Sequence, residues 1–307
     1  MKKDDALLRE LETTPIVREA KKITITAELR EKFGSKFAKE VEANRRFMVA
    51  YRLIYTSQGH AVVGYIVVPK KHATRAPTIV FNRGGSGEFG AIRIGWLFSG
   101  TIAALARAGY VVIASQYSGV AGGEGIDEMG GADLYDVLNL QKIIKNLSFC
   151  DAEKVGMYGI SRGGMMTYLS LAKAPWIKAA ITVGGLANLF RQEKLRPEMK
   201  KLYIQMFGGT PKEKKKRSAV FWADTFHKKT PLLIMHGSSD WRVNPLDSIE
   251  LAEKLYENHI PYRLMLFEGS DHGLSEHENE STNMTLSWFE RFVKNAEPLP
   301  NIKPHGS

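Results

Sequence analysis

The sequence predicts an α/β protein in which helices cover both faces of a mostly parallel central sheet and an antiparallel hairpin forms its N-terminal edge. Two observations predict this fold. From about residue 76 onward, continuous apolar runs alternate with segments of helical periodicity, which is typical of parallel strands joined by crossover helices. Before that point, residues 46–71 contain two runs of β-branched and aromatic residues separated by Ser57-Gln58-Gly59. That pattern is typical of a β-hairpin.

Length and composition indicate an ordinary globular chain, with 307 residues, 44% of them hydrophobic and 25% charged. We expect a single domain over residues 1–307, with a helical arm at 1–45 and a helical cap insertion at 186–229. The basic start of the chain has no apolar run behind it, and no stretch is long enough to span a membrane, so a cytoplasmic protein is expected. The one cysteine, Cys150, has no partner for a disulfide or a structural zinc site and is expected to pack in the core.

The individual elements follow from apolar periodicity. In the arm, apolar residues recur at every fourth position and predict an amphipathic helix: Leu29, Phe33, Phe37 and Val41. The hairpin ends at Pro69. Further strands are expected in the continuous apolar runs 76–85, 110–119, 154–160, 177–185, 231–237 and 262–269. Helices are expected at 95–109 with Gly109 as its stop, at Leu140, Ile143, Ile144 and Leu147, at 163–174, around Leu251 and Leu255, and at Leu286, Phe289 and Val293.

One serine, Ser161, lies between Gly159 and Gly163, where an apolar strand meets the start of a helix. A turn this sharp needs glycine on both sides, because side chains at 159 and 163 would collide with the neighbouring strand and helix. The serine hydroxyl is then exposed at the edge of the sheet, which is the setting of a nucleophile elbow. On this motif alone, a glycine-rich turn whose serine merely caps the helix stays open.

A serine hydroxyl is a weak nucleophile, so it needs a base that an acid holds in position. In this setting the three residues follow in the order serine, acid, histidine. Asp240 comes just after the strand at 231–237, and His272 comes just after the strand at 262–269. Both therefore belong to the same edge of the sheet as Ser161, and the sequence predicts a triad of the three.

Other acids and histidines fit this triad less well. Asp271 adjoins His272, and neighbouring side chains diverge, so Asp271 suits loop structure better than orientation of the imidazole. Asp247 falls in or at the cap of the next helix. His236 lies at a strand end, where a packed or loop-bonded histidine is expected, and the histidine at 277 lies in a polar surface stretch.

Three motifs carry a resemblance to a known family: GISRGG, HGSSDWRV and EGSDHGL. Together with the segments IYTSQGHAVVGYIVVP and ASQYSGVAGGEG, they resemble the catalytic domain of the prolyl oligopeptidase (S9) family of serine hydrolases, within the α/β-hydrolase superfamily. The resemblance covers most of the chain from about residue 46. It implies an α/β-hydrolase fold in which Ser161 is the nucleophile, Asp240 the orienting acid and His272 the general base.

The chain departs from the family pattern in two places. Prolyl oligopeptidases carry a large β-propeller before the hydrolase domain, whereas only about 45 residues precede the hairpin here, so we expect no size filter for substrates. The family's His-Gly-Gly or Tyr-Gly-Gly segment is replaced by Arg83-Gly84-Gly85. A tyrosine hydroxyl cannot act as an oxyanion donor there, and we expect backbone amides instead: that of Arg162 and one from Gly84 or Gly85.

Two roles remain open for Arg83. Its side chain either enters the site and binds a substrate carboxylate, or pairs with Glu88 or Asp127. The acidic stretch 124–128, followed by Asp133 and the acid at 136, lacks the ligand spacing of an EF-hand and is interpreted as helix N-terminal acids. We expect no metal and no cofactor.

The net charge is +10, and the densest basic run covers residues 212–217. It has no interleaved aromatics and no recognisable nucleic-acid motif, so it is interpreted as a solvated face. No nucleic-acid or membrane partner is expected.

The sequence therefore predicts a serine hydrolase that acts through an acyl-enzyme on carboxylic esters or on small amides and short peptides. The cap at 186–229, with its aromatic residues, is expected to lie over the site. Two alternatives are a prolyl-oligopeptidase-like serine peptidase and a catalytically inactive binding protein on the same fold.

Overall fold

A nine-stranded sheet runs through the computed structural model, which describes residues 3–303 and 305–306. The strand order is β1-β2-β3-β5-β4-β6-β7-β8-β9. The strands are β1 Val17–Lys22, β2 Met48–Ser57, β3 His60–Pro69, β4 Ala76–Asn82, β5 Val111–Ser115, β6 Cys150–Ile160, β7 Ile177–Val183, β8 Leu232–Gly237 and β9 Tyr262–Phe267. Met1 and Lys2 of the opening segment lie outside the described residues.

The longer helices are α1 Lys3–Thr13, α3 Ser35–Asn44, α4 Gly100–Arg107, α7 Arg162–Leu171, α9 Met199–Phe207, α11 Leu246–Glu257 and α12 Glu278–Phe289. Shorter α-helical pieces are α2 Ala27–Glu31, α5 Leu134–Leu138, α6 Leu140–Asn146, α8 Leu189–Leu195 and α10 Pro211–Lys216. Short 3₁₀ or π turns are η1 Ile94–Phe98, η2 Ala219–Phe221, η3 Ala223–Thr225, η4 Ser275–His277 and η5 Glu290–Lys294.

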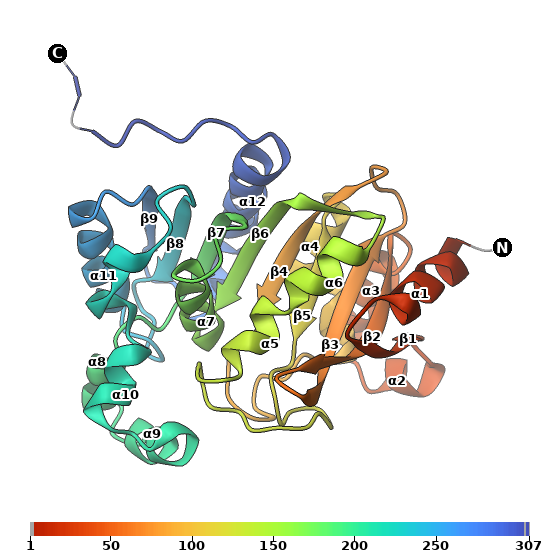
Figure 1. Cartoon of the computed structure of the whole chain (residues 1–307), viewed down its shortest axis with the longest axis horizontal. Coiled ribbons are helices and arrows are strands. Elements are labelled where there is room, and N and C mark those ends of the chain that lie inside the picture. The colour runs from red at the N-terminus through yellow and green to blue at the C-terminus, as the bar shows by residue number, and fades with distance from the viewer. Residues whose placement is uncertain (1–2, 304, 307) are drawn as a thin grey trace.

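The predicted fold class is confirmed. Strands β4 to β9 pair in parallel, whereas β2 and β3 form the predicted antiparallel hairpin and β3 runs antiparallel to β5. Helices α5, α6, α7 and α11 lie on one face of the sheet, and α4 and α12 lie on the other (Figure 1). Each face has its own cluster of buried apolar side chains, so burial on both sides explains the continuous apolar strands.

The N-terminal arm differs from the expectation of a purely helical segment. Residues 17–22 form β1, which pairs antiparallel with β2 and is the true edge of the sheet. Its sequence, VREAKK, carries four charged side chains, which is suitable for an edge strand exposed to water. The predicted amphipathic helix is divided in two: Leu29 lies in α2, Phe33 in the turn at 32–34, and only Phe37 and Val41 lie in α3, where Val41 is buried.

The single helix expected at 95–109 is divided in two. Ser99 is extended, Gly100 has a φ of +51°, and α4 begins only there. The predicted stop at Gly109 is confirmed, with a φ of +89°. Cys150 is fully buried, as expected, and burial raises the pKa of its thiol to about 12.

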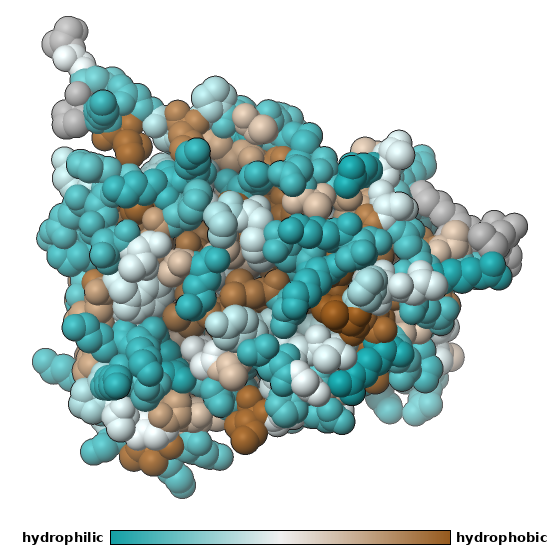
Figure 2. Space-filling model, in the orientation of Figure 1, coloured by the Kyte–Doolittle hydropathy of each residue, from teal (hydrophilic) through white to brown (hydrophobic). Residues whose placement is uncertain are grey.

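The basic run at 212–217 is only partly a solvated face. Lys212, Lys215 and Lys216 are exposed, and the face of the molecule in Figure 2 is largely hydrophilic with separate hydrophobic patches. Lys214 and Arg217 are instead buried. Lys214 pairs with a glutamate of α8, and Arg217 donates to the backbone carbonyls at 128 and 129. Lys214 thus joins α10 to α8 within the segment 186–229, and Arg217 holds that segment against residues 128 and 129. Spacing alone indicated neither contact.

Candidate active site

The turn at Ser161 has the strained geometry that the glycine pattern predicted. Ser161 lies between the end of β6 and the start of α7 with φ +58° and ψ −122°, a backbone conformation that non-glycine residues rarely adopt. A Cβ atom on Gly159 would lie 2.1 Å from the Gly163 carbonyl oxygen, and one on Gly163 would lie 2.0 Å from that of Asn82. The predicted collision with helix and strand is therefore confirmed.

Asp240 is held by four hydrogen-bond donors. Its Oδ1 accepts from the backbone amides of Arg242 and Val243 at 2.8 and 3.1 Å. Its Oδ2 accepts from His272 Nδ1 at 2.6 Å and from His236 Nε2 at 3.1 Å. The two residues predicted as acid and base therefore meet, although 32 positions separate them.

These contacts control the charges of the pair. Burial alone would raise the pKa of Asp240, but the hydrogen bonds from His236 and His272 outweigh burial and hold that pKa well below its usual range. A carboxylate only accepts hydrogen bonds, so His272 donates through Nδ1. In neutral His272, Nε2 then has a free lone pair that is able to take a proton.

Ser161 and His272 line one cavity of about 340 Å³. Within the described residues, no hydrogen bond joins the Ser161 hydroxyl to His272, a bond that often forms only once substrate is present. The backbone of Gly184 packs closely against the pair of Asp240 and His272. Gly184 has a φ of +52°, and a Cβ there would lie 2.9 Å from His272 Nδ1. A side chain at 184 would displace the imidazole.

The acids and histidines that were weighed against Asp240 and His272 have other partners. Asp271 accepts from the amides of Gly273 and Ser275, as its loop role predicted. The buried Asp247 accepts from the amide of Asn188 at 3.0 Å and fixes the start of the segment 186–229. The imidazole of residue 277 lies 3.8 Å from the carboxylate of the exposed glutamate at 268.

His236 was expected to be packed or loop-bonded, and it is fully buried. Its Nε2 contacts both Asp240 and the Val243 carbonyl oxygen, at 3.1 and 3.0 Å, and its Nδ1 lies 2.6 Å from Ser248 Oγ. That it contacts the same carboxylate oxygen as His272 was not predicted. The only signal was its place at a strand end four residues before Asp240.

The predicted oxyanion donors lie beside the nucleophile. A Cβ on Gly84 would lie 3.2 Å from the Ser161 Cβ, so only glycine permits this approach. Gly84 and Gly85 line the cavity that contains Ser161. In the part of the chain that the structure describes, no acceptor takes the amide hydrogens of Gly84, Gly85 or Arg162. These amides are free to bind an oxyanion.

The Arg83 side chain forms hydrogen bonds to the backbone of the loop that Arg83 begins and to Gln116. Its side chain is buried. The guanidinium donates to the backbone carbonyls of Gln116, Gly84, Gly87 and Phe89. Neither Glu88 nor Asp127 forms an ion pair with it among the described residues, so the predicted pairing is wrong. Bonds to four carbonyls of its surroundings favour a role for Arg83 in holding the loop over a role in substrate binding.

The partner of Asp127 is Arg162. The buried Arg162 guanidinium donates to Asp127 Oδ2 and to Asp133 Oδ2, each at 2.7 Å, and to the Gly85 carbonyl oxygen at 3.1 Å. Burial raises the pKa of Asp133, whereas Arg162 outweighs burial at Asp127 and lowers its pKa. The interpretation of these acids as helix N-terminal acids missed this buried cluster, which joins the elbow to the Gly84–Gly85 loop.

Two residues of the HGSSDWRV motif also border the site. Trp241 is 67% exposed and lines a second cavity, of about 430 Å³, and Arg242 lines both cavities. The Arg242 guanidinium lies 5.1 Å from the centre of the Trp241 ring. Sequence reasoning used this motif only for Asp240.

Neither a metal site nor a spanning helix is found in the part of the chain described. No group of three or more His, Cys, Asp or Glu residues there has a metal-binding arrangement. No described helix has the combined length and apolarity that crossing a bilayer requires.

Comparison with known proteins supplies an independent assignment. The model of the prolyl oligopeptidase family matches residues 96–296. A relative in Bacillus subtilis, "Uncharacterized peptidase YtmA", is 27% identical over 234 residues, which cover 75% of this chain and 88% of the relative. Dipeptidyl-peptidase 5 of Schizosaccharomyces pombe is 27% identical over 266 residues, which cover 78% of this chain and 37% of that protein.

Solved structures show the same fold. Acylaminoacyl peptidase from Pyrococcus horikoshii superposes with a TM-score of 0.70 at 22% identity, covering 81% of this chain and 42% of that one. The chain thus spans most of the Bacillus relative but only about two-fifths of the yeast peptidase and of this solved structure. The fold is that of the α/β-hydrolase catalytic domain in these peptidases.

Proposed function

This chain belongs to the prolyl oligopeptidase family and is a serine hydrolase, and we propose that it cleaves short peptides, small amides and carboxylic esters through an acyl-enzyme formed at Ser161. One observation carries the proposal. The strained elbow presents Ser161 to the cavity that His272 also lines, and His272 donates to the Asp240 carboxylate at 2.6 Å. That arrangement supplies a nucleophile, a base and an orienting acid.

The proposed reaction has two half-reactions. His272 Nε2 takes the Ser161 proton while Oγ attacks the substrate carbonyl carbon, and the amides of Arg162 and of Gly84 or Gly85 bind the oxyanion. The carbon–nitrogen or carbon–oxygen bond then breaks, and the leaving amine or alcohol receives the proton from His272. Water attacks the acyl-Ser161, gives its proton to His272 and releases the acid, and the proton returns to Ser161.

The peptide bond is the first candidate for cleavage, since the relatives are named peptidases. The sequence-based preference for carboxylic esters, small amides and short peptides over large proteins rests on the expected absence of a propeller and on the modest cap, and one assay compares ester with amide turnover. Matched series with one acyl group, as a nitrophenyl ester, an anilide and a dipeptide, separate the two. Turnover of the esters with no turnover of any amide would restrict the proposal to an esterase.

Covalent labelling separates an enzyme from a binding protein. A fluorophosphonate probe is expected to label the peptide that contains Ser161, and Ser161→Ala is expected to abolish the label. Ser86→Ala is the matched control, because Ser86 also lines the second cavity and its loss leaves the elbow intact. Absence of label on the folded protein, or equal label in Ser161→Ala, would favour the inactive binding protein.

A further inference from the structure

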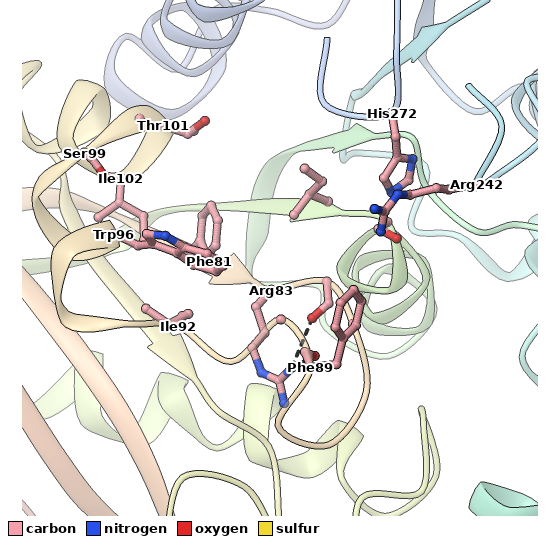
Figure 3. A pocket seen from close by; sticks show the side chains of 16 residues that line it. Phe81, Arg83, Phe89, Ile92, Trp96, Ser99, Thr101, Ile102, Arg242 and His272 are labelled. Carbon is pink, nitrogen blue, oxygen red and sulfur yellow. Dashed lines mark hydrogen bonds between the residues drawn. The ribbon is translucent and has the colours of Figure 1, made fainter. Parts of the chain in front are cut away.

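Two cavities meet at Ser161, and they differ in lining. The first is the cavity of about 340 Å³ that Ser161 shares with His272. At its far end Phe81, Trp96 and Ile102 lie together, with the hydroxyl residues Ser99 and Thr101 beside them, whereas His272 and Arg242 lie at the opposite end (Figure 3). Ile92 and Ile160 complete the apolar wall. The volume lies near the lower limit of small-molecule sites, which is about 300 Å³.

The second cavity adjoins the first, and Gly85, Phe89, Ser161 and Arg242 line both. It has a volume of about 430 Å³. Its lining mixes apolar and polar side chains, among them Leu186, Met199, Leu202, Gln192 and Arg196. Ser161 and Gly85 line both cavities, whereas Gly84 lines only the first and Arg162 only the second. A carbonyl oxygen bound by these amides would lie where the two cavities meet, and the two substituents of the carbonyl carbon, the acyl part and the leaving group, then have one cavity each available to them.

The position of His272 indicates which cavity takes the leaving group and which takes the acyl part. The leaving group must receive its proton from His272, so it has to lie on the side of the imidazole. His272 lines the first cavity, and it is not among the described residues that line the second. The acyl part of the substrate then extends toward the second cavity.

We propose that the apolar cavity formed by Phe81, Ile92, Trp96, Ile102 and Ile160 is the leaving-group pocket, and that the enzyme selects substrates whose leaving amine or alcohol carries a bulky apolar group. For a peptide, the residue after the cleaved bond is aromatic or branched aliphatic. This inference rests on the proposed acyl-enzyme function. It names the part of the substrate that the first cavity selects.

The acyl-enzyme itself provides the test. A nitrophenyl ester acylates Ser161 and releases nitrophenol, and an added amine then competes with water for the acyl group. In that step the amine nitrogen forms the new carbon–nitrogen bond while His272 takes an amine proton, the ester bond from the acyl carbon to Ser161 Oγ breaks, and His272 returns the proton to Oγ. The ratio of new amide to free acid, measured by chromatography, reports how well the amine binds in the leaving-group pocket and is independent of the rate of acylation.

We expect phenylalaninamide and leucinamide to capture the acyl group at least about tenfold better than glycinamide, since apolar groups in a pocket discriminate by about 10-fold or more. Trp96→Ala removes a large part of the apolar wall at the far end, and since Trp96 is 44% exposed the fold is expected to tolerate the change. The substitution is expected to reduce this preference severalfold. Leu202→Ala is the matched control in the second cavity. It is expected to alter the preference among acyl chains and to leave the amine preference unchanged.

The outcomes separate this inference from the function on which it rests. Absence of any nitrophenol release that depends on Ser161, together with absence of fluorophosphonate label on Ser161, would overturn the proposed function. A normal burst with equal capture of glycinamide and phenylalaninamide would overturn only the leaving-group pocket. A preference that survives Trp96→Ala and disappears in Leu202→Ala would assign the leaving group to the second cavity.

Discussion

Replacing Asp240 by asparagine tests how His272 is held. In the structure Oδ1 of Asp240 accepts from two backbone amides, those of Arg242 and Val243. The asparagine carbonyl therefore keeps the position of Oδ1, and its NH₂ group takes the position of Oδ2, facing His272 Nδ1. An NH₂ group donates, so His272 has to accept through Nδ1 and carry its proton on Nε2. That tautomer has no lone pair for the serine proton.

The expected loss is large because the tautomer changes while the shape is kept. The same substitution in a Ser-His-Asp triad lowers kcat by about 10⁴-fold. We expect kcat/KM of Asp240→Asn to fall by about 10³- to 10⁴-fold, or about 4–5.5 kcal/mol of transition-state stabilisation at 1.36 kcal/mol per factor of ten. Labelling by fluorophosphonate is expected to slow to a similar extent.

The assay is steady-state hydrolysis of a nitrophenyl ester, with circular dichroism to confirm folding. Asp271→Asn is the matched control, since it is the same substitution at the residue adjoining His272, and among the described residues the Asp271 carboxylate accepts hydrogen bonds from Gly273 and Ser275 of its own loop. We expect that variant to lose no more than about tenfold. If Asp240→Asn kept near-normal kcat, another acid would have to orient His272 and the reasoning would be refuted.

Three further predictions follow from the buried geometry. Gly163→Ala places a methyl group 2.0 Å from the Asn82 carbonyl oxygen, and we expect a loss of about 3 kcal/mol or more in unfolding free energy, seen as a lower Tm; an unchanged Tm would contradict this clash. Arg162→Met leaves two buried carboxylates without their cation and is expected to destabilise the fold by about 3–5 kcal/mol, whereas adding Asp127→Asn to it is expected to recover part of the loss in urea unfolding. Burial raises the pKa of Asp247 from 3.8 to about 6, so between about pH 4 and pH 6 the folded state binds more protons than the unfolded state. The unfolding free energy of the wild type relative to that of Asp247→Asn should therefore fall as the pH rises through this range. An unfolding free-energy difference that stays constant over this range would contradict the raised pKa.

Much of the fold was predictable from the sequence because burial on both faces makes β4, β5, β7, β8 and the second half of β6 largely apolar. The elbow was predictable because only glycine fits at 159 and 163. The acid and the histidine were placed by one rule, that parallel strands end at the same edge. These features depend on local sequence or on strand order.

The missed features depend on contacts between distant segments. Strand β1 is an edge strand with charged side chains, so it has no apolar pattern by which to recognise it. The Arg162 side chain carries no local sign of burial, and its partners lie 29 and 35 positions away. Arg83 binds backbone carbonyls, which any sequence supplies. Composition and spacing cannot predict such contacts, because only the folded loops bring the two partners together.

The hydrogen bond from the Arg162 guanidinium to the Gly85 carbonyl oxygen leads to a prediction about how fast a transition-state analogue binds. Because one buried cation joins the nucleophile elbow to the opposite loop, the two halves of the proposed oxyanion hole are assembled before a ligand arrives. A boronic acid that forms a tetrahedral anion on Ser161 is therefore expected to bind in one kinetic phase, without a slow rearrangement. Loosening that link, as in Arg162→Met, is expected to add a second, slower phase.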